Sequence, residues 1–149
     1  MPRTFDQILA ELAALKAEDF NEDKPTDGIQ KLYELSVDIE ALPQRERCVP
    51  AIFAFFERLL NAHLGIPGSL VHVLETMRGH YEQELVESIK RQPTDSTVSM
   101  AIGIFNGSRD AEQKQFYLDL IRFAMGHPLV SEAAFYAAQN FIEYQNEVA

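Results

Sequence analysis

Three side chains between positions 72 and 80 are of types that bind transition metals or move protons: His72, Glu75 and His80. The spacing of these three residues matches neither His-Glu-x-x-His nor Glu-x-x-His, the patterns that place two metal ligands on one face of a helix. His72 stands between two valines, so we expect a hydrogen-bonded interior imidazole. The sequence therefore predicts no enzyme, no metal site and no cofactor. An enzyme built on these three residues is the weakest of three alternatives.

An acidic loop near position 20 has part of the pattern of a calcium-binding EF-hand. Asp19, Asn21 and Asp23 would occupy ligand positions 1, 3 and 5 of such a loop. Position 6 would then be Lys24 where a glycine is required, and position 12 would be Gln30, which has no carboxylate. The loop is predicted to be a solvated acidic turn.

Two further features have alternative interpretations. Residues 65–69 (Gly-Ile-Pro-Gly-Ser) resemble an anion cradle at a helix start, but no lysine follows them, and a turn between packed helices is favoured. Cys48 has arginines at 45 and 47, which could lower its pKa, but no partner base is suggested. We expect Cys48 to be a buried structural thiol.

Charge is the most informative global property. The 149 residues include 23 acidic and 13 basic side chains, so the net charge is −10. Residues 1 to 42 carry a net −6, residues 43 to 93 are neutral, and residues 94 to 149 carry −4. Such a field repels phosphate backbones and anionic lipid and attracts basic proteins. Direct binding to nucleic acid or membrane is disfavoured, and the alternative role of the acidity is solubility.

Four residues at spacings of four, three and four form one stripe on a predicted helix: Asp27, Lys31, Glu34 and Asp38. The preceding turn adds three more carboxylates. The predicted partner-binding residues are therefore Asp19, Glu22, Asp23, Asp27, Glu34 and Asp38. The alternative for each of these residues is that it simply lies on the solvent-exposed side of an amphipathic helix.

Helical spacing of apolar residues extends over nearly the whole chain, and no alternating strand pattern competes. A capping box from Thr4 to Gln7 begins the first helix, near residues 4 to 18. Pro50 fits the first turn of the most apolar helix, Ser69 can cap the fourth helix, and Thr94 or Asp95 can cap the sixth. The pattern predicts about eight helices, with the last near 131 to 146.

Short turns between these helices favour antiparallel helical hairpins. We expect one all-α domain over residues 1–149, either stacked like HEAT or armadillo solenoids or packed as an irregular bundle. No signal peptide or membrane span is predicted, and the single cysteine is typical of the cytoplasm. The expected core comprises Phe53, Phe56, Leu59, Leu74, Leu85, Ile102, Phe105, Leu120 and Phe141, together with Phe116 and Phe123.

The middle of the chain resembles small bacterial immunity proteins of polymorphic and contact-dependent toxin systems. The similarity covers roughly residues 64 to 106 and rests on Gly65-Ile66-Pro67-Gly68-Ser69-Leu70-Val71-His72, Tyr81-Glu82, Arg91-Gln92-Pro93-Thr94 and Asn106. The resemblance implies a protein made beside a toxin, which binds the toxin's active domain and blocks it. The acidic charge predicts that this toxin domain is basic. The alternative is a HEAT-like adaptor for another protein, without a toxin partner.

Overall fold

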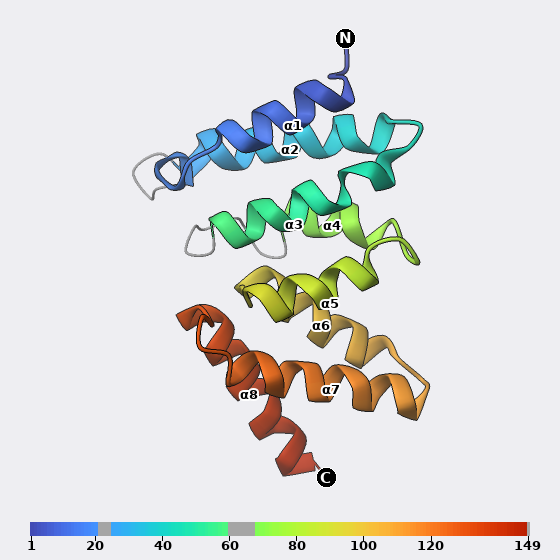
Figure 1. Ribbon diagram of the computed structural model, residues 1–149, viewed down its shortest axis with the longest axis vertical. Coiled ribbons are helices and arrows are strands. Elements are labelled where there is room, and N and C mark those ends of the chain that lie inside the picture. Colours follow the sequence, from blue (N-terminus) through green and yellow to red (C-terminus); the bar gives the residue numbers. More distant parts are fainter. Residues whose placement is uncertain (21–24, 60–67, 149) are drawn as a thin grey trace. The chain divides into compact units, whose positions relative to one another are not determined.

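The computed structural model describes residues 1–20, 25–59 and 68–148, in which helices joined by turns and loops are present and no strand is found (Figure 1). The eight α-helices there are α1 (Phe5–Ala14), α2 (Pro25–Ala41), α3 (Val49–Arg58), α4 (Ser69–Glu75), α5 (Glu82–Arg91), α6 (Asp95–Gly107), α7 (Ala111–Met125) and α8 (Glu132–Val148). Two short 3₁₀ helices, η1 (Ala17–Phe20) and η2 (Arg45–Cys48), precede α2 and α3. The predicted all-α class is confirmed.

Local sequence signals set several helix ends. The Thr4 hydroxyl accepts from the backbone N–H of Gln7, whose side chain accepts from the Thr4 N–H, as the predicted capping box requires. Thr94 and Thr97 form the same reciprocal pair at the start of α6. Pro50 lies in the first turn of α3, where its missing N–H leaves no helical hydrogen bond unmade.

Two boundaries differ from expectation. The first helix ends at Ala14 rather than near residue 18, because η1 follows it and the Asp19 carboxylate accepts from the Lys16 N–H at 2.8 Å. The N-cap of α4 is Gly68 rather than Ser69. Gly68 has a φ of 91°, a backbone conformation that glycine adopts without steric cost.

The chain forms two compact units, Met1–Glu84 and Leu85–Ala149. In the first unit, α1 packs on α3 and α2 packs on α4, while α1 and α2 also contact each other. Figure 1 shows α1 and α3 running in one direction and α2 running back. This is the stacking of antiparallel hairpins that the short turns predicted. The single domain over 1–149 and the regular solenoid stay predictions.

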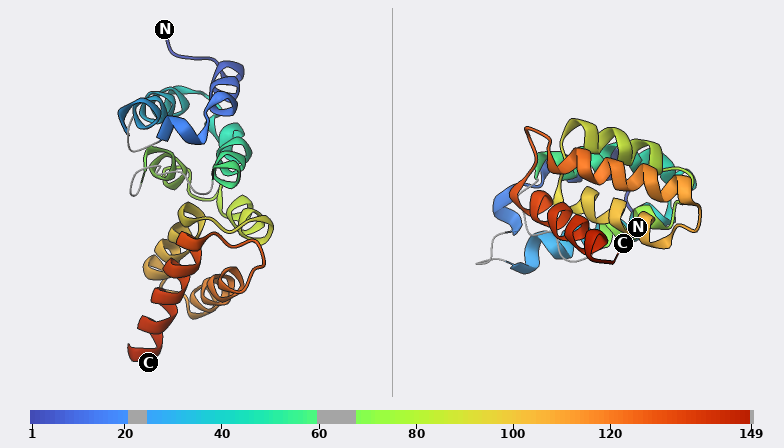
Figure 2. Two further views of the ribbon diagram at one scale, coloured as in Figure 1. Left: turned by 90° about the vertical axis from the view of Figure 1, so that its left-hand side faces the viewer. Right: turned by 90° about the horizontal axis from the view of Figure 1, so that it is seen from below.

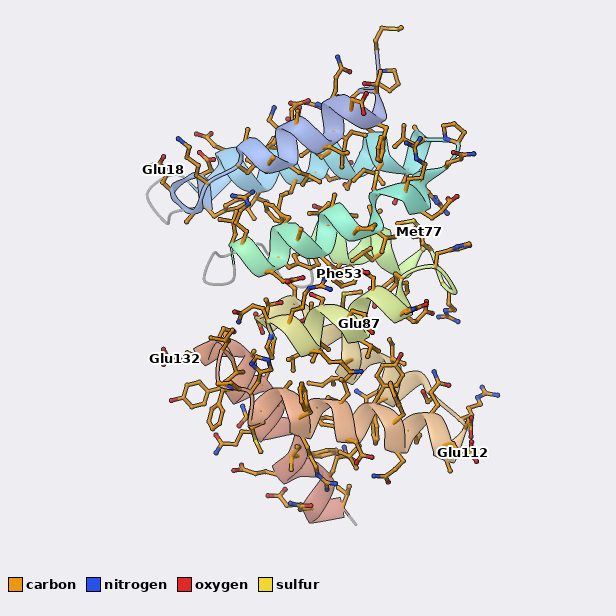
Figure 3. The ribbon with its side chains drawn as sticks, in the orientation of Figure 1. Glu18, Phe53, Met77, Glu87, Glu112 and Glu132 are labelled. Atoms are coloured by element: carbon orange, nitrogen blue, oxygen red, sulfur yellow. The ribbon has the colours of Figure 1, made fainter. Side chains whose placement is uncertain are left out.

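The first unit has a dense apolar core. Ile8, Leu35, Ile52 and Leu74 are fully buried, and so is Phe53, which Figure 3 labels on α3. The predicted core residues Phe56 and Leu59 are buried as well. Phe20 from η1 meets Phe55 edge to face at a centroid distance of 6.1 Å, which ties the segment before α2 to α3.

In the second unit α6, α7 and α8 all contact one another, and Figure 2 gives two further views of these helices. Phe105 of α6 and Phe141 of α8 meet edge to face at 5.0 Å. The loop after α7 is anchored to the end of α5 through His127. The Leu129 N–H donates to His127 Nδ1 at 3.0 Å, so the ring proton is on Nε2, which donates to the Lys90 carbonyl at 2.8 Å.

Three apolar residues predicted for the core lie elsewhere. Phe116 and Phe123 are each 50% exposed, and Ile102 is only half-buried. The buried face of α7 is narrower than its apolar stripe, because Tyr117, Leu120, Ile121 and Ala124 already fill the contact with the other helices. The other predicted core residues of this unit, Leu85, Leu120, Phe105 and Phe141, are buried. No helix among the described residues has the length and hydropathy to cross a membrane.

Candidate protein-binding surface

The predicted acidic stripe of α2 turns out to be partly neutralised within the first unit. Arg3, just before α1, donates from Nη1 to the Asp38 carboxylate at 2.9 Å and from its backbone N–H at 3.1 Å. Its Nη2 lies 3.5 Å from Glu34. Asp38, with a side chain only 15% exposed, is therefore a structural partner of Arg3 rather than a free carboxylate.

Glu11 extends these contacts into a network of five charged residues. Its carboxylate accepts from Arg3 Nε and, at 3.0 Å, from Lys31 Nζ. Hydrogen bonds from the Arg3 side chain and from Lys31 hold the pKa of Glu11 below its usual range. The pKa of Asp38 is lowered chiefly by the hydrogen bond from the Arg3 backbone N–H. Together these contacts join the N-terminal segment and α1 to α2.

Arg3→Ala is expected to lower the free energy of unfolding by about 1 to 2 kcal/mol at pH 7, because it removes the hydrogen bonds and ion pairs of the network. The loss is modest because solvent partly screens these charges. Both carboxyl pKa values are lowered in the folded state, so their stabilisation is present above the unfolded values of about 4. It is lost as the pH falls through the lowered folded values. Denaturant unfolding of the wild type and the variant at pH 7 and near pH 2.5 measures this.

The difference between the two proteins should be smaller near pH 2.5 than at pH 7. Arg109→Ala, at an exposed loop position, is the matched control and should have little effect at either pH. A difference for Arg3→Ala that stays constant with pH would show that the carboxylates do not carry the effect.

The remaining predicted site residues do not form one cluster. Asp19 is half-buried and accepts the Lys16 N–H, so it belongs to the turn after α1. Asp27 is exposed in the first turn of α2, where a carboxylate interacts favourably with the positive end of the helix dipole. Glu22 and Asp23 lie outside the described residues.

The solvent side of α2 combines apolar and acidic side chains. Tyr33 is 57% exposed and Val37 is 49% exposed, four residues apart and hence on one face. By helical spacing Glu34 flanks them on one side and Glu40 on the other, and both are exposed. We call these four residues the α2 outer face. An exposed tyrosine between carboxylates can receive an arginine or lysine by ring stacking and ion pairing together.

A groove of about 260 Å³ runs between α1 and α3 on another side of this unit. Small and apolar residues line it, with one charged group among them: Leu9, Leu12, Ala13, Ala51, Ala54, Phe55 and Arg58. Arg58 donates to the carbonyls of Leu12 at 2.9 Å and Leu15 at 2.8 Å and so caps the end of α1. The volume of the groove suits one or two side chains of another chain better than a drug-sized ligand.

The second unit also exposes aromatic rings. Four exposed residues follow one line along α7 at spacings of four, three and four: Glu112, Phe116, Asp119 and Phe123. We call this line the α7 stripe. Figure 3 labels Glu112 at the first turn of α7. Asp119 accepts from Gln115 at 2.9 Å and lies 3.9 Å from Arg122.

The residues with catalytic or metal-binding side chains stay apart. His72, Glu75 and His80 are all exposed, and no three His, Cys, Asp or Glu side chains within residues 1–20, 25–59 and 68–148 could hold one metal ion. His72 was expected in the interior, but its neighbours Leu70, Val71, Val73 and Leu74 occupy the buried side of α4. Cys48 is fully buried as predicted, and burial raises the pKa of its thiol, against the opposing charge of Arg47.

Sequence reasoning missed the exposed apolar residues of the α2 outer face and of the α7 stripe for the same reason. Tyr33 and Val37 lie at helical spacing, as do Phe116 and Phe123, and that spacing alone does not separate a core face from an exposed one. The sequence signal that could have revealed them is that each helix has more apolar residues than one of its faces can bury. Comparisons with protein-family models, curated proteins and solved structures give no match to this chain.

Proposed function

We propose that this chain is a non-enzymatic protein-binding module that neutralises a basic toxin domain, as an immunity protein does. The observation that carries the proposal is the α2 outer face, where Tyr33 and Val37 are exposed between Glu34 and Glu40. Aromatic side chains are enriched at binding hot spots, and a rim of complementary charge speeds association.

The rest of the chain is consistent with a basic partner. The net charge is −10, and Asp27 lies seven residues before Glu34, on the same side of α2. A nuclease-type toxin has a basic cleft for phosphates, and carboxylates presented on a helix can occupy it. The resemblance of residues 64 to 106 to immunity proteins supplies the class of partner.

The test uses the purified chain and the toxin domain encoded beside its gene. Glu34→Lys/Glu40→Lys is expected to slow association at least tenfold at low salt and to flatten its dependence on ionic strength. Tyr33→Ala should act mainly on dissociation, because it removes a ring contact without changing charge. Stopped-flow measurements between about 0.05 and 0.5 M salt separate these effects. Asp38 is left unchanged because it accepts two hydrogen bonds from Arg3, at 3.1 and 2.9 Å, whereas Glu34 is more exposed and approaches Arg3 only to 3.5 Å.

Glu143→Lys/Glu147→Lys on α8 is the matched control, since both residues are exposed and the change in net charge is identical. It should slow association less than the α2 double variant does. Equal slowing by both variants would mean that only the overall field matters and would remove the site from α2. A neighbouring product that neither harms cells nor binds the chain would favour the adaptor alternative.

A further inference from the structure

The α1–α3 groove and the α7 stripe have complementary chemistry. The groove presents Leu9 and Phe55 beside the small side chains of Ala13, Ala51 and Ala54, so it has space for large apolar groups from outside. The α7 stripe presents two large apolar groups, Phe116 and Phe123, each 50% exposed. The two surfaces belong to different units of the chain.

Their lengths also agree. Along α3 the groove extends from Ala51 to Arg58, seven residues, or about 10.5 Å at 1.5 Å per residue. Phe116 and Phe123 are likewise seven residues apart on α7, which gives the same span of about 10.5 Å. A helix laid along the groove can therefore place one ring near each end.

Charge decides which kind of occupant the groove suits. Its one charged lining residue is Arg58, whose guanidinium has five N–H donors and uses two of them on the carbonyls of Leu12 and Leu15. The remaining donors favour a carboxylate and disfavour a basic partner. The α7 stripe supplies carboxylates beside its rings, at Glu112 and Asp119.

We propose that the α1–α3 groove binds the α7 stripe of a second copy of this chain. Phe116 and Phe123 enter the groove, and Glu112 or Asp119 pairs with Arg58. The contact joins two different surfaces, so it is heterologous: each copy offers one groove and one stripe. Two aromatic anchors make a small interface, for which we expect a dissociation constant on the order of 10 to 100 µM.

Analytical ultracentrifugation of the full chain tests this from about 1 to 500 µM, at about 0.15 M salt to screen the repulsion between acidic copies. The wild type is expected to associate with increasing concentration. Phe123→Glu, which removes the stripe, and Ala54→Glu, which fills the groove, should each weaken association at least tenfold. Both positions are exposed, so far-ultraviolet circular dichroism should show an unchanged helix content.

Mixing the two variants distinguishes this contact from any other. The Phe123→Glu protein keeps its groove and the Ala54→Glu protein keeps its stripe, so an equimolar mixture should form a one-to-one dimer and nothing larger. Tyr144→Ala, at an exposed aromatic of α8, is the control and should associate like the wild type.

Three results would overturn the proposal. The first is a wild type that stays monomeric throughout the concentration range; if its Ala54→Glu variant also loses affinity for the toxin domain, the occupant of the groove is that partner. The second is association that survives Ala54→Glu, and the third is a mixture of the two variants that remains monomeric, since either result places the contact elsewhere. The affinity of the α2 outer face for the toxin domain is measured in a separate experiment, so the failure of this proposal and the failure of the proposed function are distinguishable.

Discussion

Phe56→Ala is expected to lower the free energy of unfolding of the first unit by about 3 to 5 kcal/mol. Phe56 is 2% exposed and its ring meets Phe53 edge to face at 5.9 Å and Phe55 at 6.2 Å. The truncation removes the transfer free energy of the ring and leaves a cavity among aromatic neighbours on the same helix, whose backbone limits how far they can collapse.

Denaturant unfolding followed by circular dichroism measures this loss. Phe123→Ala is the matched control, because it removes the same atoms from a ring that is 50% exposed, and it should cost less than about 1 kcal/mol. Equal losses for the two variants would contradict the packing of α3. A loss confined to one of two unfolding transitions would show that the two units unfold separately.

The fold class could be predicted because its signals are local. Helical spacing of apolar residues, the capping pairs at Thr4 and Thr94, and Pro50 in a first turn all act within a few residues. Short turns then limit neighbouring helices to antiparallel hairpins, which the first unit shows.

The candidate site was harder to predict because it depends on contacts far apart in sequence. Asp38 was assigned to a binding stripe, yet its partner Arg3 is 35 residues away and precedes the first helix. Spacing places Asp27, Lys31, Glu34 and Asp38 on one side of α2, but it does not show that α1 lies beside that side. Only packing separates a carboxylate that stabilises the fold from one that can meet a partner.

The same distinction divides the apolar residues. Val37 and Phe123 have the spacing of core residues, but neighbouring side chains already fill the buried faces of their helices. Apolar rings and methyl groups that are exposed to solvent lower the solubility of a protein. Proteins commonly retain such groups where another chain covers them. On α7 the proposed contact surface therefore lies where helical spacing predicted core residues, Phe116 and Phe123, that the structure leaves exposed.

Gly28→Ala is expected to destabilise the first unit by about 2 to 4 kcal/mol, although alanine is the better helix former. A Cβ at Gly28 would lie 2.5 Å from the Asp19 carbonyl oxygen and 2.7 Å from the Phe20 ring. Backbone and ring would both have to move, and Phe20 would then lose its contact with Phe55.

Gly103→Ala in α6 separates this steric effect from helix propensity. Gly103 is also inside a helix, but its added Cβ would meet nothing within 4 Å. The substitution should therefore stabilise the protein by up to about 1 kcal/mol. Thermal and denaturant unfolding of both variants gives the comparison. If Gly28→Ala proved as stabilising as Gly103→Ala, η1 would not pack against α2 as closely as described, and the turn that carries Asp19 would be free of that helix.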